Sequence, residues 1–401
     1  MNQTVTIKIK LLIGKTSEFE ELTQRFSAVC NYVSNWIFTH NCELNQAVIN
    51  KCLYYKIRDK FKIKAQLTQS AIRTTVAKYK TVKTQLTKKK WHYYDKSTDT
   101  NYYVKRDLTW LQKPIQFNLP QADLQRNRDW SIVQNQLSIN TLGKRIKTDY
   151  ICKGFNQHLG KSWKLGLGKL IQFNKQWYFY VSATKELSDY KLNQTRHIVG
   201  IDRGLRFLAT CYDEQGQTKF FSGKQVLAKR RKYKKLRQEL QSKNTKSAKR
   251  RLKKIGQREN RWMSDVNHCL SKTLVNMYGP NTLFVLEDLN GVTFNTTKHH
   301  KKENRYEHNS WAFYQLEQDL TYKAHLNNSQ VIEVDAHYTS QRCPKCGRIN
   351  KDNRDHDLHL YHCDCCGYSS NDDRIAAINI QYLGTEYMSG NAHPKFGKQE
   401  Q

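Results

Sequence analysis

The chain has 401 residues, and its 68 Lys and Arg against 35 Asp and Glu give a net charge of +33. This length allows two or three domains, each with its own core. So large a positive charge argues against a self-contained metabolic enzyme, whose surface would repel itself. It indicates a polyanionic partner, of which nucleic acid is the commonest. A basic but inert surface is the alternative.

The hydropathy and cysteine patterns indicate a chain of the reducing cytoplasm. No apolar run approaches the twenty residues of a membrane span, and the N-terminus lacks the basic and apolar stretches of a secretory signal. The 11 cysteines are odd in number, and five of them lie between Cys343 and Cys366. This pattern predicts a metal site and scattered thiols instead of disulfides.

The first half of the chain predicts a β-barrel-like domain with a helical insertion. Residues 4–12 alternate as a strand does, and residues 17–90 carry apolar side chains at helical spacing. Residues 101–185 are rich in β-branched and aromatic residues, with a clear hairpin between Leu170 and Ala183. Because the N-terminal strand would complete the same sheet, we expect the helices to interrupt one β domain.

Three separated carboxylates in the second half are candidate metal ligands. Asp202 ends the apolar run 198–201, Glu287 ends the run 283–286, and Asp373 opens a helix-like stretch. Divalent ions prefer hard oxygen ligands, and hydrolysis at phosphorus uses one ion on the attacking oxygen and one on the leaving oxygen. The three acids therefore indicate a two-metal phosphodiesterase.

Residues 224–261 form the most basic tract, in which two thin apolar seams flank a polar stretch. This pattern predicts a helical hairpin with cationic outer faces. Few acids are present to pair with the charges within a helix, so we expect the tract to bind phosphates. A solvated charged face is the alternative. The candidate nucleic-acid contacts are Arg230, Arg231, Lys234, Lys235, Arg250 and Arg251.

Two C-x-x-C-G knuckles, 343–347 and 363–367, have the spacing of a zinc ribbon. The positions of the glycines select Cys343, Cys346, Cys363 and Cys366 as ligands and leave Cys365 a spare. Four protein ligands leave no open position, so the zinc is expected to be structural. The alternative ligands are His356, His359 and His362.

Short stretches of the second half, in a fixed order, carry a family resemblance. They are Gly200–Gly204, Leu286–Leu289, Trp311–Phe313, Tyr322–Ala324, Thr339–Cys343 with the two knuckles, and Ala376–Ile380. Together they resemble the TnpB (OrfB) family of transposon-encoded, RNA-guided DNA endonucleases, which are related to miniature type V CRISPR effectors. The resemblance covers about residues 196–383, and the N-terminal half resembles the family only in layout.

The resemblance implies a multidomain α+β fold. Its parts are an N-terminal wedge β-barrel with a helical recognition insertion, and a C-terminal RuvC-like nuclease of RNase H fold with an inserted zinc ribbon. The expected boundaries are 1–15 and 91–190 for the barrel, 16–90 for the insertion, 196–340 and 368–385 for the nuclease, 341–367 for the ribbon, and 386–401 for a flexible tail.

The resemblance also places the nuclease acids at Asp202, Glu287 and Asp373. The family usually has Asn where Ile375 stands; counting back from Ala376 selects Asp373 and leaves Asp372 as the alternative. Asp288 points to the opposite strand face from Glu287 by alternation, and we interpret it as structural.

The implied activity is cleavage of double-stranded DNA beside a short flanking motif, directed by a guide RNA that pairs with one strand. The expected cofactors are two Mg²⁺ ions at the acids, structural Zn²⁺ and guide RNA. The expected partners are guide RNA, from a transposon end or a CRISPR array, and target DNA on a prokaryotic nucleoid, with no membrane and no small-molecule substrate. Three alternatives remain: a miniature type V CRISPR effector, a non-cleaving RNA-guided DNA-binding protein, and a zinc-ribbon transcription factor. The last would leave the acids unexplained.

Overall fold

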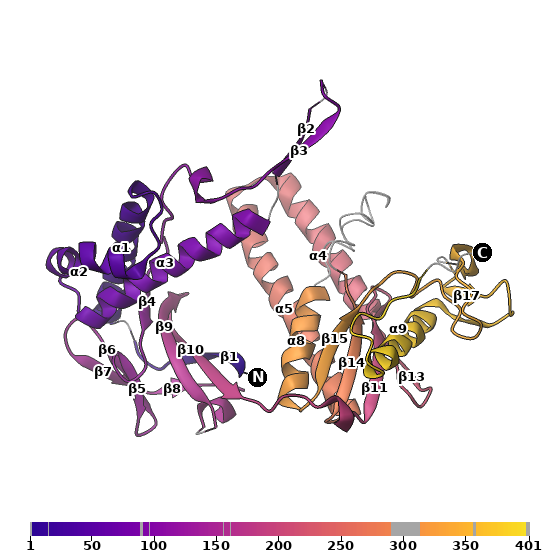
Figure 1. The fold of residues 1–401 in the computed structure, drawn as a ribbon. Helices are drawn as coiled ribbons and strands as arrows, with labels where there is room; N and C mark the ends of the chain where they lie inside the picture. The colour runs from indigo at the N-terminus through magenta and orange to yellow at the C-terminus, as the bar shows by residue number, and fades with distance from the viewer. Residues whose placement is uncertain are drawn as a thin grey trace. The chain divides into compact units, whose positions relative to one another are not determined.

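The structure, a computed structural model, describes residues 2–14, 16–88, 91–95, 97–154, 156–160, 162–289, 313–355 and 358–397. Trp311 and Ala312 of the family stretches, and His356 among the alternative zinc ligands, lie outside the described residues. The protein is mixed α/β and separates into two compact units, Asn2–Glu186 and Leu187–Gln401 (Figure 1). None of the described helices is long and apolar enough to cross a membrane.

The helices of the N-terminal unit are α1 (Ser17–Thr39), α2 (Gln46–Phe61) and α3 (Ala65–Lys88). The stretch that the sequence predicts as helical is thus broken twice. Asn45 starts α2, because its side chain accepts a hydrogen bond from the backbone N–H of Ala47. Lys62 ends α2 in the left-handed conformation. Helix α1 packs on α3, where Ser34 Oγ lies 3.0 Å from the hydroxyl of Tyr79.

The main sheet of this unit joins the N-terminal strand to the predicted hairpin. Its order is β4 (Gln121–Leu124), β9 (Lys164–Phe173), β10 (Gln176–Glu186), β1 (Asn2–Leu11) and β8 (Tyr150–Ile151), with antiparallel neighbours. Phe19 of α1 packs edge-on against Trp177 of β10, with ring centroids 5.4 Å apart. The helices therefore cover the sheet through a shared aromatic core.

Smaller elements complete the N-terminal unit. A three-stranded sheet contains β5 (Trp130–Val133), β6 (Gln136–Asn140) and β7 (Arg145–Thr148), and a hairpin contains β2 (Trp91–Asp95) and β3 (Thr100–Val104). Short 3-10 helices are η1 (Leu108–Trp110) and η2 (Asn156–Leu159) here, and η3 (Leu192–Gln194) and η4 (Lys351–Asn353) in the C-terminal unit.

The C-terminal unit is built on a mixed five-stranded sheet. Its order is β13 (Thr218–Ser222), β12 (Phe207–Tyr212), β11 (His197–Asp202), β14 (Thr282–Glu287) and β15 (Gln330–Val334). Strands β11, β14 and β15 are parallel, whereas β12 and β13 continue from β11 as an antiparallel meander. The carboxyl ends of β11 and β14 therefore meet at one edge of the sheet.

Helices cover both faces of this sheet, which explains why its central strands are continuous apolar runs. Val199, Ile201, Phe284 and Leu286 pack with α5 (Lys246–Tyr278) and α8 (Phe313–Leu326) on one face. Leu283 and Val285 pack on the other face with Ile380 and Leu383 of α9 (Asp372–Met388). Since side chains alternate along a strand, each central strand serves both layers.

The basic tract folds as the predicted helical hairpin, α4 (Lys224–Lys243) followed by α5. Asn244 turns the chain in the left-handed conformation, and Thr245 caps α5 by accepting from the backbone N–H of Ala248 at 3.2 Å. A thin seam of apolar residues, including Leu240, Ala248 and Ile255, holds the two helices together.

The cysteine knuckles lie between β15 and α9, in a small antiparallel sheet of β16 (Arg354–Asp355), β17 (Leu360–His362) and β18 (Ser369–Asn371). Ile375 of α9 joins the core of this segment, with Cys343, Tyr361 and Cys363. The cysteine segment is therefore packed directly on the helix that carries Asp373.

The predicted flexible tail, 386–401, begins with the last residues of a helix and continues as coil up to residue 397, the last one described. Helix α9 continues to Met388, and Phe396 packs beside the apolar cluster that α9 forms with the sheet. The ring of Phe396 also stacks on that of Tyr382, with centroids 6.0 Å apart, and the guanidinium of Arg342 lies 4.7 Å from it. An aromatic anchor of this kind holds a segment that its polar composition alone marks as loose.

Candidate active site and metal centre

Strand pairing sets Asp202 beside Glu287. The parallel register joins Ile201 of β11 to Leu286 of β14, and each acid is the next residue on its strand. Alternation places both side chains on the sheet face that α9 covers, the face of Leu283 and Val285. Asp288 falls on the opposite face by the same rule and is exposed.

Asp373 reaches the same edge from the start of α9. Asn371 caps this helix by accepting from the backbone N–H of Arg374 at 3.1 Å, so Asp372 and Asp373 occupy its first turn. Carboxylates are favoured there because the free backbone N–H groups carry partial positive charge. Both residues are buried, Asp372 completely.

The electrostatics show that the three acids share one environment. Burial first, and then the negative charges of Glu287 and Asp373, raise the pKa of Asp202 well above its usual value. Burial also raises the pKa of Glu287, although a hydrogen bond from Thr339 and the charges of Arg203 and Arg354 oppose it. Burial and the neighbouring charge of Asp372 raise the pKa of Asp373. Acids that repel one another in a buried site need a bound cation or protons to be stable.

Asp372 and Asp373 have different surroundings. Asp372 pairs with Arg354, whose Nε lies 3.0 Å from Asp372 Oδ2, and its Oδ1 lies 3.5 Å from Nδ1 of His359. Asp373 is 3.9 Å from the same guanidinium, and its charge raises the pKa of Asp202 more than that of Asp372 does. The contacts thus favour Asp373 as the third acid of the site, and its role stays a prediction.

The spacing of the acids bears on how they could hold a cation. In the described parts of the chain, two sets of three or more metal-ligating side chains have ligand atoms within 4.8 Å of one another: the four cysteines, and His359 with Asp372 and Asp373. Asp202 and Glu287 belong to neither set. The carboxylates at the sheet edge are therefore too far apart for all three to ligate one ion as they stand. Hard oxygen donors in a repelling, buried group nevertheless fit Mg²⁺.

Two residues beside Glu287, Thr339 and Arg203, lie in the stretches that carry the family resemblance, but the sequence analysis assigned them no role. The hydroxyl of Thr339 lies 2.5 Å from Glu287 Oε1. Arg203, which follows Asp202 and is buried, donates to the backbone carbonyl of Glu287 at 2.6 Å and pairs with Glu317 at 3.0 Å. Arg354 had no signal in the sequence, because only the folding of the cysteine segment brings it to α9.

The four predicted zinc ligands lie together. The Sγ atoms of Cys343 and Cys366 are 3.6 Å apart, and those of Cys346 and Cys363 are 3.5 Å apart. A tetrahedral zinc with bonds of about 2.3 Å sets its sulfurs about 3.8 Å apart, so the cluster has the dimensions of a zinc site. Cys365 is exposed and outside the cluster.

The backbone around the sulfurs is arranged as two matching turns. Gly347 and Gly367 take positive φ values of 80° and 69°, and their N–H groups donate to the carbonyls of Cys343 and Cys363. A hydrogen bond from the backbone of Arg348 lowers the pKa of Cys346 to about 7, whereas burial raises that of Cys343 to about 12. Metal binding at this site must therefore release protons. Of the alternative zinc ligands, His359 contacts the carboxylate of Asp372, and His362 is hydrogen-bonded to the hydroxyl of Ser369.

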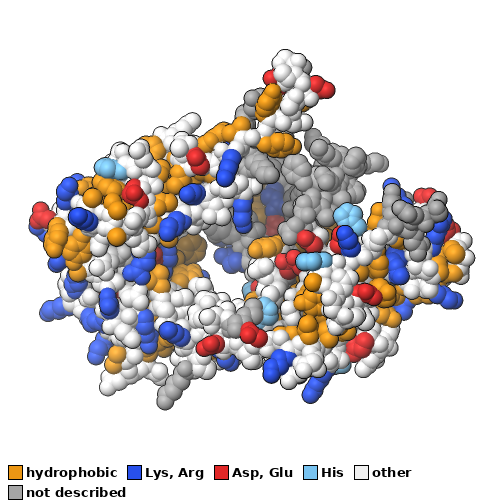
Figure 2. Space-filling model, viewed as in Figure 1, with side chains coloured by type: hydrophobic (Ala, Val, Ile, Leu, Met, Phe, Trp, Pro, Cys, Tyr) orange, Lys and Arg blue, Asp and Glu red, His pale blue; other side chains and the backbone are white. Residues whose placement is uncertain are grey.

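The predicted nucleic-acid contacts on the α4–α5 hairpin fall into two groups. Arg230 is only 6% exposed, so the helix packing removes it from the surface, contrary to the expectation of an outer face. Arg231, Lys235, Arg250 and Arg251 are exposed, and Lys234 is partly so. Figure 2 shows Lys and Arg side chains spread over the drawn face of both units. These cationic side chains suit a polyanion.

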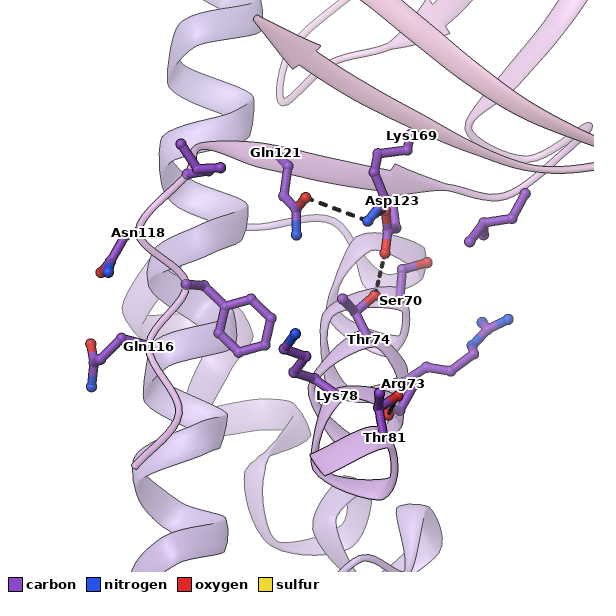
Figure 3. Close-up of a pocket in the computed structure, with 14 residues that line it drawn as sticks. Ser70, Arg73, Thr74, Lys78, Thr81, Gln116, Asn118, Gln121, Asp123 and Lys169 are labelled. Atoms are coloured by element: carbon purple, nitrogen blue, oxygen red, sulfur yellow. Dashed lines mark hydrogen bonds and ion pairs between the residues drawn. The ribbon is translucent and has the colours of Figure 1, made fainter. Parts of the chain in front are cut away.

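A pocket of about 740 Å³ lies in the N-terminal unit, between α3, β4 and β9 (Figure 3). At its wall the hydroxyl of Thr74 donates to buried Asp123 at 2.6 Å, and Lys169 lies 3.2 Å from the same carboxylate. Arg73 and Lys78 also line it. Its charged lining residues are Arg73, Lys78, Lys169 and Asp123, and the sequence pattern gave no sign of the pocket.

Two family models match the C-terminal unit and the end of β10. The one described as "Probable transposase" (OrfB_IS605) matches residues 181–292, and the one described as "Cas12f1-like, TNB domain" matches residues 313–380. TnpB-like protein L79 of Acanthamoeba polyphaga mimivirus is 27% identical over 215 residues, which are 49% of this chain and 39% of that protein. Over these residues the chain is similar to the TnpB family. The family prediction from the sequence is thereby confirmed.

The chain is also similar to CRISPR-associated nucleases. The CRISPR-associated endodeoxyribonuclease Cas12f1 of Sulfoacidibacillus thermotolerans is 44% identical over 71 residues, 18% of this chain and 17% of that protein. The chain therefore spans well under half the length of these curated relatives. A cryo-EM structure of CasPhi-2 (Cas12j) bound to crRNA and phosphorothioate-DNA has a TM-score of 0.55 at 11% identity, covering 98% of this chain and 93% of that one. The chain thus shares its fold with CasPhi-2.

Proposed function

We propose that the protein is a transposon-encoded, RNA-guided endonuclease that cleaves double-stranded DNA beside a short flanking motif. The observation that carries the proposal is the meeting of Asp202, Glu287 and Asp373 at one edge of the sheet, where the charges of Glu287 and Asp373 raise the pKa of Asp202. The similarity to the TnpB family supports guide RNA and target DNA as partners.

We infer that the C-terminal unit is a RuvC-like nuclease of RNase H fold. The sheet order, with a three-strand meander followed by two parallel strands, supports this, as does a helix that carries the last acid. The cysteine segment between β15 and α9 is the inserted zinc ribbon of this proposal. The N-terminal unit would then supply the wedge barrel, with α1 to α3 as the recognition insertion; the domain boundaries given from the sequence stay predictions.

Asp202, Glu287 and Asp373 would hold Mg²⁺, which when bound activates water and stabilises the leaving oxygen of a phosphodiester. Other residues of the chain orient the carboxylates and balance their charge. Thr339 and Arg203 orient the carboxylate and backbone of Glu287. Arg354 neutralises Asp372, so that this acid adds less repulsion to the site. The buried setting strengthens each of these interactions.

The cationic surfaces supply nucleic-acid affinity in this proposal. Exposed Lys and Arg side chains on α4 and α5 would contact phosphates, and the pocket lined by Arg73 and Lys78 offers a second polyanion-binding surface in the other unit. The zinc would be structural, because four cysteines leave no ligand position open. A cytoplasmic location stays a prediction.

The test is a cleavage assay with the protein, the RNA that co-purifies with it, and plasmids carrying a guide-matched target beside randomised flanks. We expect Mg²⁺-dependent cutting of matched targets, and loss of cutting by on the order of 10³-fold or more in Asp202→Ala with guide and target binding retained. Asp288→Ala is the matched control, since this neighbouring acid lies on the opposite strand face and is exposed.

Other outcomes separate the alternatives. Cutting that ignores the guide sequence would indicate a nonspecific nuclease. Guide-dependent binding without cutting by the unmutated protein would indicate a non-cleaving RNA-guided DNA-binding protein. A guide that derives from a repeat array instead of a transposon end would favour a miniature type V effector with the same chemistry.

A further inference from the structure

Thr339 touches the Glu287 carboxylate from outside the sheet. Its Oγ1 lies 2.5 Å from Glu287 Oε1 and 2.9 Å from the backbone carbonyl of Ala336, and the side chain is 1% exposed. A hydroxyl has one proton to donate. When Glu287 is ionised, as cation binding requires, the proton goes to Glu287, because a hydrogen bond to a charged acceptor is the stronger one.

Holding one oxygen of a carboxylate fixes the direction of the other. Glu287 ends strand β14, so its backbone is set by the sheet, whereas its side chain has three rotatable bonds beyond it. The hydroxyl of Thr339, a residue that is almost completely buried, removes much of that freedom by a short contact. A ligand that is already oriented loses less entropy when a cation binds.

Asn379 holds Thr339 in place. It lies on α9 and is completely buried; its Nδ2 donates to the backbone carbonyls of Thr339 and Arg342, both at 2.7 Å. Its Oδ1 accepts from the guanidinium of Arg342 at 3.3 Å. Asn379 therefore ties the segment just before Cys343 to the helix that begins with Asp373.

We propose that Thr339 is a positioning residue for Glu287, anchored by Asn379, and that it links the cysteine ribbon and α9 to the cation affinity of the sheet-edge acids. The inference rests on the proposed function only in that Asp202, Glu287 and Asp373 bind a divalent cation. It assigns Thr339 no contact with DNA.

The test measures Mn²⁺ binding to the zinc-loaded full chain by electron paramagnetic resonance, without DNA. We expect Thr339→Val to weaken the Mn²⁺ affinity of the site that Asp202→Ala abolishes, by on the order of 10–100-fold. Thr339→Ser, which keeps the hydroxyl, should restore the affinity to within about threefold. Thr282→Val is the matched control, because Thr282 is also completely buried on β14 and bonds backbone carbonyls, but at the far end of the strand.

A purely structural role would lower the melting temperature and zinc content in Thr339→Val and Thr282→Val alike, without a selective loss of Mn²⁺ affinity. Should Thr339→Val not fold, Thr339→Ala removes the same hydroxyl and carries the test. Mn²⁺ affinity equal to that of the unmutated protein in a folded hydroxyl-free variant would overturn the proposal.

Cleavage assays then separate this inference from the proposed function. In Thr339→Val, raising Mg²⁺ should restore most of the cutting rate, because the defect is in affinity and not in the reaction at saturation. If the unmutated protein binds Mn²⁺ at Asp202 but cuts no DNA, the proposed function fails while the affinity loss in Thr339→Val still supports the positioning role.

Discussion

Gly200 of β11 lies directly against the backbone of Ala377 in α9. A Cβ at Gly200 would come 2.3 Å from the carbonyl oxygen of Ala377 and 2.4 Å from the backbone nitrogen of Gln381. A second glycine, Gly384 of α9, makes the reciprocal approach, since a Cβ there would lie 2.5 Å from Val285 Cγ2. These contacts set the height of α9 above the sheet, and with it the position of Asp373 relative to Asp202.

Gly200→Ala should therefore destabilise the protein and disturb the acid site together. The added methyl group meets backbone atoms, which cannot rotate away, so we expect a loss of about 1–3 kcal/mol or more in the free energy of unfolding. Divalent-cation affinity should fall as well. Gly256→Ala is the control: Gly256 lies in α5 with no heavy atom within 4 Å of an added Cβ, so a gain of up to about 1 kcal/mol is expected. Denaturant unfolding and Mn²⁺ titration measure both effects, and an unperturbed Gly200→Ala would contradict this account of the packing.

Asp373→Asn and Asp372→Asn should have different effects, the first on DNA cleavage and the second on stability. The first should abolish DNA cleavage with a small effect on folding, because it removes a carboxylate that faces Asp202. The second leaves the Arg354 guanidinium without its closest anion, so it should cost stability more than cleavage. Melting curves and cutting rates, measured on the same preparations, compare the two. Equal loss of cleavage in both variants would undo the assignment of Asp373.

Metal analysis should give about one zinc per chain, held by the four clustered cysteines. We expect Cys366→Ser to lower the zinc content and the melting temperature, while Cys365→Ser, the matched control on the adjacent exposed residue, should retain both. Full retention of zinc in Cys366→Ser would move the fourth ligand elsewhere.

The metal-free protein should become more stable at neutral pH when Asp202 is replaced by Asn. Burial and the charges of Glu287 and Asp373 raise the folded-state pKa of Asp202 above its unfolded value. As pH rises from the unfolded pKa through the folded pKa, the unfolded chain loses its proton first, so the stability of the unmutated protein falls over that window. Below the window both states are protonated and no difference remains.

Asp202→Asn removes that carboxylate, so its melting temperature should exceed that of the unmutated protein by on the order of a few degrees at pH 7. The difference should vanish in acid, and saturating Mg²⁺ should shrink or reverse it. Thermal melts with chelator and with Mg²⁺ check this. A less stable Asp202→Asn protein in chelator at pH 7 would refute the repulsion.

Reversing the exposed charges of the α4–α5 hairpin should weaken nucleic-acid binding. A quadruple change of Arg231, Lys235, Arg250 and Arg251 to Glu should reduce the affinity by on the order of 10-fold or more and lower the salt dependence by about one counterion per lost contact. Circular dichroism should show an intact fold, since these side chains are exposed. Unchanged affinity and salt slope would mean that the hairpin is only a solvated face.

The sequence predicts the elements that local pattern controls. The apolar runs before Asp202 and Glu287 are strands, the basic tract is a helical hairpin, and the hairpin after Leu170 pairs with the N-terminal strand as expected. The cysteine spacing also predicts the observed cluster, because two tight turns present their sulfurs whatever the rest of the chain does.

The structural features that the sequence does not predict depend on contacts between residues far apart in the chain. Arg354 and Thr339 reach the acids only because the cysteine segment packs on α9, and no sequence periodicity predicts that packing. Arg230 has the same composition around it as Arg231, but the helix packing buries one and exposes the other. The packing of Phe396 beside the apolar cluster of α9 likewise has no signal in the polar composition of the tail.

The insertion of the cysteine segment between β15 and α9 has a consequence for the order of synthesis. Domains of a nascent chain generally fold as they emerge, N-terminal first. The cationic hairpin, and the strands that carry Asp202 and Glu287, are therefore made before the helix that carries Asp373. Since that helix packs with the cysteine segment, its arrival is coupled to metal capture. In the proposed nuclease, the acid site is therefore completed last, after the basic surfaces have been synthesised and the cysteines have bound their metal.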